Sequence, residues 1–261
     1  MSRIASKILA SAAFVLLLAG CSAEVSVESP DDLYAMAGEF RRTGSSLDAL
    51  NFYQRAADLG HARALLIVAH HEASNTLPAS LADAAVAEPV ASSRGYESAL
   101  AALRQLGDKG DVEALMLAGL MTFVGYGTEP DSTQGRALLV RSAELGSAEA
   151  PFWLAWTLER DHRYRDAANE YERAIAMGYA PAFVELAMLH IDGRLVGESY
   201  ARGMAMLRVA HERGDTRAGE LFLGLLERTE RSAADGNTLA RERLREMHLT
   251  GLMEVSYVGT E

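Results

Sequence analysis

One short signature recurs five times along this chain: a glycine, three variable residues, and then an alanine that begins an apolar helical pattern. The glycines are separated by 50, 36, 32 and 36 residues. Periods of this length are typical of helical repeats that stack into a solenoid, because each repeat buries its apolar face against its neighbours. The sequence therefore predicts an all-α solenoid of about six antiparallel helix pairs. The five pairs are Gly60/Ala64, Gly110/Ala114, Gly146/Ala150, Gly178/Ala182 and Gly214/Ala218.

The residues before each glycine also recur by size. Small residues lie eleven positions before the glycine, large ones seven before, and mostly small ones four before. Spacings of four and three place these positions on one stripe of a helix, so the small positions should let a neighbouring helix come close. Each glycine should then end its helix with a positive φ. In chain order the stripes are Ala49/Tyr53/Ala56, Ala99/Leu103/Leu106, Gly135/Leu139/Ser142, Ala167/Tyr171/Ala174 and Gly203/Leu207/Ala210.

The turns between the helices carry a family resemblance. In the segment 113–147, Gly125-Tyr126-Gly127 lies in the turn and Gly135-Arg136-Ala137 opens the second helix. This arrangement resembles the Sel1-like repeat, a relative of the tetratricopeptide repeat. The resemblance covers most of residues 33–250, although the unit 149–178 lacks the glycine turn and is closer to the tetratricopeptide form. It implies a right-handed superhelix with a concave docking face; the alternative is a set of unrelated helical hairpins with similar composition.

These signals divide the chain into a repeat domain at 30–250, with an insertion at 75–94, and a tail at 251–261. The insertion is predicted to be either a short extra helix or a mobile flap, because it is longer than an ordinary connection. First helices of the pairs are expected near 31–43, 62–74, 112–124, 149–160, 181–191 and 217–229. Second helices are expected near 47–59, 95–107, 132–145, 164–177, 200–213 and 237–248.

Residues 1–20 have the layout of a secretory signal peptide, followed by a linker at 21–29. Arg3 and Lys7 precede an apolar run that is too short to span a bilayer, since a spanning helix needs about 20 apolar residues. The run ends in Leu18-Ala19-Gly20-Cys21, which resembles the bacterial lipobox. That resemblance implies that Cys21 is acylated, as with palmitate, and becomes the first residue of a mature lipoprotein. The alternative is an ordinary signal peptide with a chance cysteine at its cleavage site.

The residue after Cys21 and the charge balance bear on location and partners. By resemblance to the bacterial sorting rule, Ser22 implies the outer membrane, with the domain on its periplasmic face. Loss of Arg3 and Lys7 with the leader leaves 23 basic residues against 36 acidic ones, a net charge of −13. Such acidity argues against nucleic acid as a partner. Cys21 is the only cysteine, so its acylation would leave no disulfide and no thiolate metal site in the mature chain.

Motifs for catalysis or for cofactors are sparse. His70-His71-Glu72 is the one local cluster with metal-ligand chemistry, but adjacent helical residues diverge by roughly 100°, so both imidazoles cannot easily bind one ion. Gly125-Tyr126-Gly127-Thr128 lacks the lysine and the spacing of a phosphate-binding loop. We therefore expect no catalytic residues, no metal site and no cofactor, and predict that the protein is not an enzyme.

The tetratricopeptide resemblance implies which residues line the concave face. In each first helix these are the positions six, ten and thirteen after the glycine. In the three middle repeats they are mainly apolar, and a contiguous apolar surface usually marks an interaction site. The alternative is that they are buried against the insertion or the next turn of the solenoid. The predicted partner-binding residues are Met116, Leu120, Phe123, Phe152, Trp156, Val184, Met188 and Ile191.

Two functional classes follow from these features. The favoured one is a membrane-anchored periplasmic scaffold that binds envelope proteins through its concave face, in envelope assembly or polysaccharide export. The other is a glycan-binding protein or enzyme on a helical-repeat scaffold, acting on peptidoglycan. The second class requires converging acids or hydroxyls on the concave face, whereas the predicted lining is mainly apolar.

Overall fold

The structure is a computed structural model that describes residues 29–74, 94–195 and 200–250. The predictions for the signal peptide, for Cys21 and the linker up to residue 28, for residues 75–93 of the insertion at 75–94 and for the tail from 251 concern residues outside these ranges.

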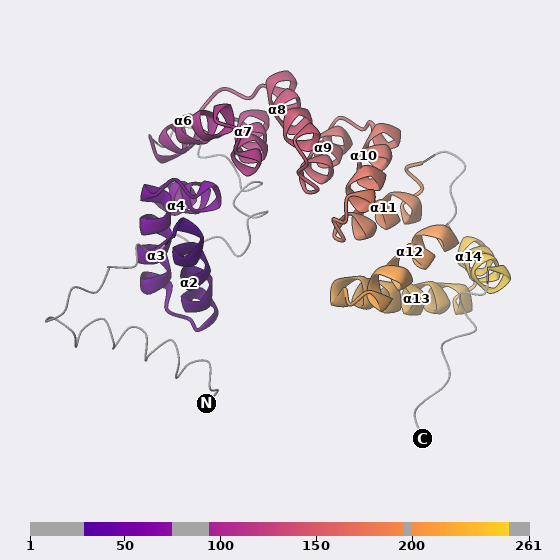
Figure 1. The fold of residues 1–261 in the computed structure, drawn as a ribbon. Helices are drawn as coiled ribbons and strands as arrows, with labels where there is room; N and C mark the ends of the chain where they lie inside the picture. The colour runs from indigo at the N-terminus through magenta and orange to yellow at the C-terminus, as the bar shows by residue number, and fades with distance from the viewer. Residues whose placement is uncertain (1–28, 75–93, 196–199, 251–261) are drawn as a thin grey trace, which may run out of the picture.

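The described residues form twelve α-helices and no strand. Each helix packs against the next one in the chain, and the helices follow one another around an arc from α2 and α3 to α13 and α14 (Figure 1). The predicted all-α repeat architecture is therefore confirmed. The helices are α2 (Pro30–Arg42), α3 (Ser46–Asp58), α4 (Ala62–Ser74), α6 (Arg94–Asp108), α7 (Val112–Val124), α8 (Ser132–Glu144), α9 (Ala150–Arg160), α10 (Tyr164–Ala176), α11 (Ala182–Ile191), α12 (Tyr200–Glu212), α13 (Thr216–Ala234) and α14 (Thr238–Leu249).

The helix ends lie within one residue of the predicted ones, except at the end of α13. That helix was expected to end near 229 but continues to Ala234. The additional residues are good helix formers, and the helix ends where Gly236 adopts a φ of 97°. Side-chain caps fix the starts of α7, α8 and α13, where the Asp111, Asp131 and Asp215 carboxylates each accept a hydrogen bond from a backbone N–H three residues later.

All five repeat glycines end their helices as predicted. Their φ values lie between 87° and 102°, the left-handed region that other residues rarely adopt. The N–H of Gly60 donates to the Ala57 carbonyl and the next N–H donates to the Ala56 carbonyl, which closes the helix end. At the end of α9, where the repeat lacks a glycine, His162 takes this conformation with a φ of 59°. The same turn is therefore built once without its usual residue.

The small-large-small stripes are buried between paired helices. The large members, Tyr53, Leu103, Leu139, Tyr171 and Leu207, are at most 2% exposed. At Gly135 an added Cβ would lie 2.8 Å from the Gly119 carbonyl oxygen and from the backbone of Phe123. Helices α7 and α8 therefore approach so closely at this point that only glycine fits.

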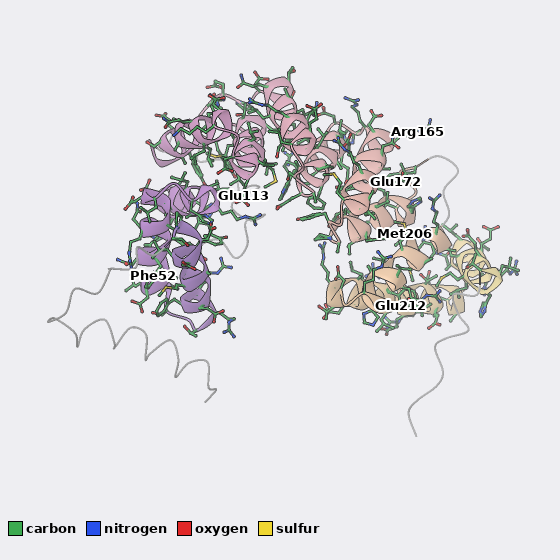
Figure 2. The ribbon with its side chains drawn as sticks, in the orientation of Figure 1. Phe52, Glu113, Arg165, Glu172, Met206 and Glu212 are labelled. Atoms are coloured by element: carbon green, nitrogen blue, oxygen red, sulfur yellow. The ribbon has the colours of Figure 1, made fainter. Side chains whose placement is uncertain are left out.

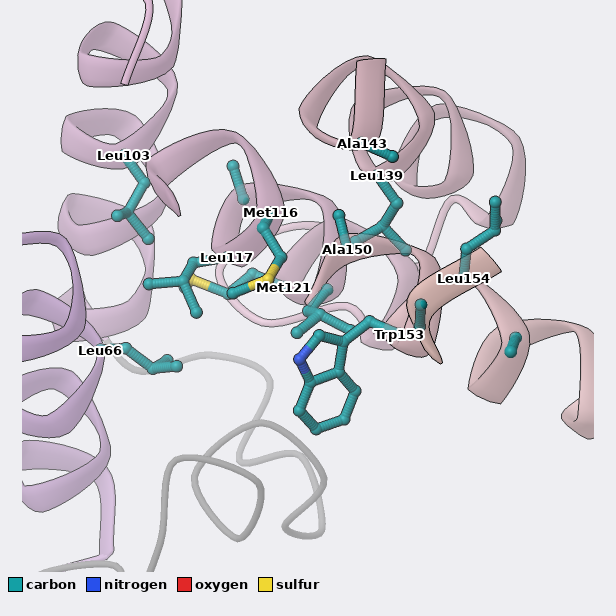
Figure 3. Close-up of a cluster of buried hydrophobic side chains, with 14 of the residues drawn as sticks. Leu66, Leu103, Met116, Leu117, Met121, Leu139, Ala143, Ala150, Trp153 and Leu154 are labelled. Carbon is teal, nitrogen blue, oxygen red and sulfur yellow. The ribbon is translucent and has the colours of Figure 1, made fainter. Parts of the chain in front are cut away.

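Buried apolar residues form three clusters along the arc. The largest cluster extends from α4 to α11 and contains Leu66, Leu103, Met116 and Trp153 (Figure 3). A second cluster joins α11 to α14, and a third joins α2, α3 and α4. Because each cluster draws on successive helices, the fold is held by contacts between neighbouring repeats.

Candidate interaction surface on the inner helices

The inner side of the arc is formed by the first helices of the repeats. In Figure 1, α7 and α9 lie inside the arc and α6 and α8 lie outside it. Most of α9 is buried, including Trp153, Leu154 and Leu158. The side chains of Phe152, Trp156 and Glu159 are partly exposed, and their spacing places them on one stripe of the helix. This stripe is the part of α9 that is open to solvent within the arc.

An unbroken series of aromatic contacts extends along this surface from α7 to the turn before α11. The ring centroids of Phe123 and Trp156 are 5.8 Å apart, those of Trp156 and Trp153 are 6.0 Å apart, and those of Trp153 and Phe152 are 5.2 Å apart. These distances and the edge-on geometry are those that aromatic pairs prefer. The inner aromatic ladder, as we call it, consists of Phe123, Trp156, Trp153, Phe152, Tyr171 and Tyr179.

Arginine side chains lie over the partly exposed end of the ladder. The Arg136 guanidinium is 5.3 Å from the centroid of the Phe123 ring, and that of Arg160 is 4.9 Å from the Trp156 ring. Arg136 also donates to the hydroxyl and the carbonyl of Thr157 and pairs with Asp161, so its position is fixed. Arg160 is exposed, and an exposed long side chain can yield its place on the Trp156 ring to another group.

Four of the eight predicted partner-binding residues are buried and do not lie on an open surface. Met116 and Leu120 are each 1% exposed, because α7 packs against α4, α6, α8 and α9 at once. Figure 3 shows Met116 within the core. Val184 is 1% and Ile191 6% exposed in the cluster that joins α11 to α14. The expectation that these four side chains line the concave face is thus corrected.

The other four, Phe123, Phe152, Trp156 and Met188, are partly exposed. The structure brings Phe123, Phe152 and Trp156 together in the ladder, whereas Met188 packs against the cluster that contains α12. On α11 the partly exposed positions include Met188 and Glu185, which are three residues apart and share a face. The open stripe of α11 therefore includes a charged residue that the sequence analysis did not select. The partner-binding role of the four exposed residues stays a prediction.

A charged bridge at the start of the inner helices was also missed. Arg63 of α4 pairs with Glu113 of α7, and its NH2 group donates to Glu149 at 2.9 Å. Glu149 also accepts a hydrogen bond from the Trp153 indole at 3.0 Å. Figure 2 shows Glu113 on the inner side of the arc, while Arg165 points away from it. The three charged residues each lie three positions after a repeat glycine, so alignment on the glycines could have found them.

The pKa values of Tyr179 and Glu159 at this surface are raised. Burial, followed by the nearby negative charge of Glu149, raises the pKa of Tyr179 to about 12. Burial also raises the pKa of Glu159, whose carboxylate accepts a hydrogen bond of 2.5 Å from the Tyr171 hydroxyl. The negative charge of Glu185 adds to that increase, and the Tyr171 hydrogen bond opposes it. Glu159 is therefore a half-buried carboxylate in surroundings that disfavour its charge.

The cluster His70-His71-Glu72, singled out in the sequence for its metal-ligand chemistry, lies at the end of α4. His70 is buried, and its Nδ1 lies 3.1 Å from the Tyr96 hydroxyl, so its ring belongs to the core between α4 and α6. Within the described ranges, no three His, Cys, Asp or Glu side chains come close enough to hold a metal ion. In the same ranges, no helix combines the length and the apolar character needed to cross a membrane.

Comparisons with known proteins identify the fold. No protein-family model matches the chain, and no similar curated protein is found. The crystal structure of a Sel1 repeat protein from Oxalobacter formigenes is similar, with a TM-score of 0.53 and 16% sequence identity over 94% of this chain and 98% of that one. A protective antigen of uropathogenic Escherichia coli with an SLR fold has a TM-score of 0.45 and 21% identity, over 86% of this chain and 50% of that one. The first likeness shows that this chain has the Sel1-repeat solenoid fold.

Proposed function

We propose that the protein is a scaffold that binds partner proteins through the inner side of its arc, in the bacterial envelope. The observation that carries the proposal is the inner aromatic ladder, which includes the partly exposed Phe123, Phe152 and Trp156. A few residues supply most of the binding energy at protein interfaces, and tryptophan and tyrosine are enriched among them. A helical-repeat scaffold holds such side chains on rigid elements, which lowers the entropy lost on binding.

The proposed location rests on the leader. Leu18-Ala19-Gly20-Cys21 and Ser22 support a lipid-anchored protein at the periplasmic face of the outer membrane, where Cys21 would be the acylated residue. Several acyl chains hold a protein stably, since each buried methylene adds about 0.8 kcal/mol. Replacement of Cys21 by Ser should move the protein from the membrane fraction to the soluble periplasm. Unchanged membrane retention of that variant would contradict the anchor.

Partner binding can be tested in cells with a photo-reactive phenylalanine analogue at single positions. Position 156 on the ladder is the test position, and position 47 on α3, where Leu47 is 84% exposed, is the matched control. We expect discrete cross-linked proteins from position 156 and none in common from position 47. If position 156 yields no adduct while the protein is folded and anchored, the proposed binding face is wrong. Adducts with glycan strands instead of protein would favour the peptidoglycan-binding alternative.

A further inference from the structure

Two places on the inner helices are built alike. In the first, acids at the start of α7 and α9, Glu113 and Glu149, lie on either side of Arg63, and Trp153 donates a hydrogen bond to Glu149. The second lies between the last turn of α9 and the first turn of α11, where Glu159 and Glu185 are close enough to interact electrostatically. Here too an aromatic side chain donates a hydrogen bond to one of the acids, from the Tyr171 hydroxyl to Glu159.

The two places differ in their basic partner. Arg63 serves both acids of the first place, whereas in the described part of the chain Glu159 has no salt bridge and its hydrogen-bond donor is Tyr171. Glu185 pairs with Arg217 of α13 at 3.2 Å, and in the described residues this arginine forms no salt bridge with Glu159. Glu159 is thus a half-buried acid without a salt bridge in the described residues, whereas Glu113 and Glu149 share Arg63.

Neighbouring arginines are engaged elsewhere. Arg194 lies near enough to lower the pKa of Glu159, yet it donates to the Tyr164 hydroxyl at 3.1 Å and lies 3.5 Å from the Asp192 carboxylate. Arg160 lies over the Trp156 ring. Neither forms a salt bridge with Glu159 in the described residues.

We infer that the scaffold recognises a segment of its partner that carries an arginine or lysine next to large apolar residues. This inference rests on the proposed function. The apolar residues pack on Phe152 and Trp156, and the cation pairs with Glu159, as Arg63 pairs with Glu113 and Glu149. A cation restores the ionised state that burial disfavours, and a charge-assisted hydrogen bond in a half-buried site is stronger than one in water.

A random library of linear peptides displayed on phage tests the inference with the purified periplasmic domain. Selected peptides should be enriched in arginine or lysine beside aromatic or large aliphatic residues. Their affinity should fall about tenfold on Glu159→Gln, as expected for loss of one charge-assisted pair. The amide oxygen of glutamine still accepts the Tyr171 hydrogen bond, which preserves the fold. Glu172→Gln, at an exposed position of α10, is the matched control and should leave the affinity unchanged.

The outcomes separate this inference from the proposed function. Selected peptides that are apolar without a basic residue, and that bind Trp156→Ala weakly, would overturn the inference and keep the binding face. Basic peptides whose affinity is equal for Glu159→Gln and wild type would also overturn it. Peptides that bind Trp156→Ala as well as wild type would contradict both the inference and the proposed binding face.

Discussion

Single residues of the repeat turns behave as the sequence predicts, because their requirement is local. The glycines at 60, 110, 146, 178 and 214 all have positive φ, and this follows from backbone sterics without any knowledge of neighbours. The turn at His162 could not be found in this way, since it has no glycine to reveal it. The Arg63 bridge could be predicted only in part. Its three members occupy the same position relative to the glycines, but whether their opposite charges form ion pairs depends on how the helices stack.

Gly178 and His162 permit a matched test of the helix-ending turn. A Cβ at Gly178 meets no atom within 4 Å, so Gly178→Ala adds backbone strain alone and should lower the free energy of unfolding by about 1 kcal/mol. His162→Gly should leave the free energy of unfolding unchanged or raise it by up to about 1 kcal/mol. The relief of backbone strain is offset by a more flexible unfolded chain and by loss of the contact with Tyr164. Urea unfolding of both variants measures this. A stabilising Gly178→Ala would refute the role assigned to the glycine.

Glu159 should make the stability depend on pH. Its pKa is raised in the folded state, so between its usual pKa and the raised value the folded protein binds more protons than the unfolded chain. Stability contributed by this group is therefore present below pH 4 and is lost as the pH rises through the raised value. The free energy of unfolding of Glu159→Gln, relative to that of wild type, should therefore be higher at pH 7 than at pH 4. The difference should be less than about 1 kcal/mol, because the group is half exposed. Urea unfolding at both pH values, with Glu172→Gln as control, measures the difference; an equal gain for both variants would contradict it.

Helices were predicted more accurately in extent than in orientation. The limits of α7 follow from the Asp111 cap and from Gly125, and α11 ends at the turn of Gly193, and these residues all lie next to the helices in the sequence. Their exposed faces depend on which helices lie beside them. Because α7 contacts helices on both sides, Met116 and Leu120 are buried. On α11, Met188 is partly exposed beside Glu185, while Val184 is buried. Positions taken from the tetratricopeptide form could not anticipate this packing.

Close packing of α7 on α8 should be sensitive to one methyl group. Gly135→Ala places a Cβ 2.8 Å from backbone atoms of α7, so the two helices must separate, at a cost of about 1–3 kcal/mol. Gly224→Ala on α13 is the matched control, since its Cβ meets nothing within 4 Å, and it should stabilise by about 0.5–1 kcal/mol through helix propensity. Thermal unfolding of the two variants gives the comparison. Equal shifts of the same sign would mean that close approach is not what glycine provides at position 135.

The molecule as a whole is an arc of repeats whose stability comes from contacts between neighbours. Its period and helix pairing could be predicted from five glycines. Its curvature could not, because it depends on how each pair is rotated relative to the next, and this decides which apolar residues become core and which become surface. The two tryptophans of α9, three residues apart, show this difference. Trp153 is 4% exposed and donates a hydrogen bond to Glu149, whereas Trp156 is partly exposed within the arc.

These two tryptophans provide the most direct test of whether the inner aromatic ladder has a binding role beyond its role in folding. The measurement pairs the free energy of unfolding with partner recovery from solubilised envelopes, for Trp153→Ala and Trp156→Ala. We predict that Trp153→Ala loses about 3–5 kcal/mol, as a buried tryptophan does. Trp156→Ala should lose no more than about 2 kcal/mol and yet no longer recover the partners that wild type recovers. If Trp156→Ala instead loses as much stability as Trp153→Ala, or recovers the same partners as wild type, Trp156 is a structural residue and the binding face lies elsewhere.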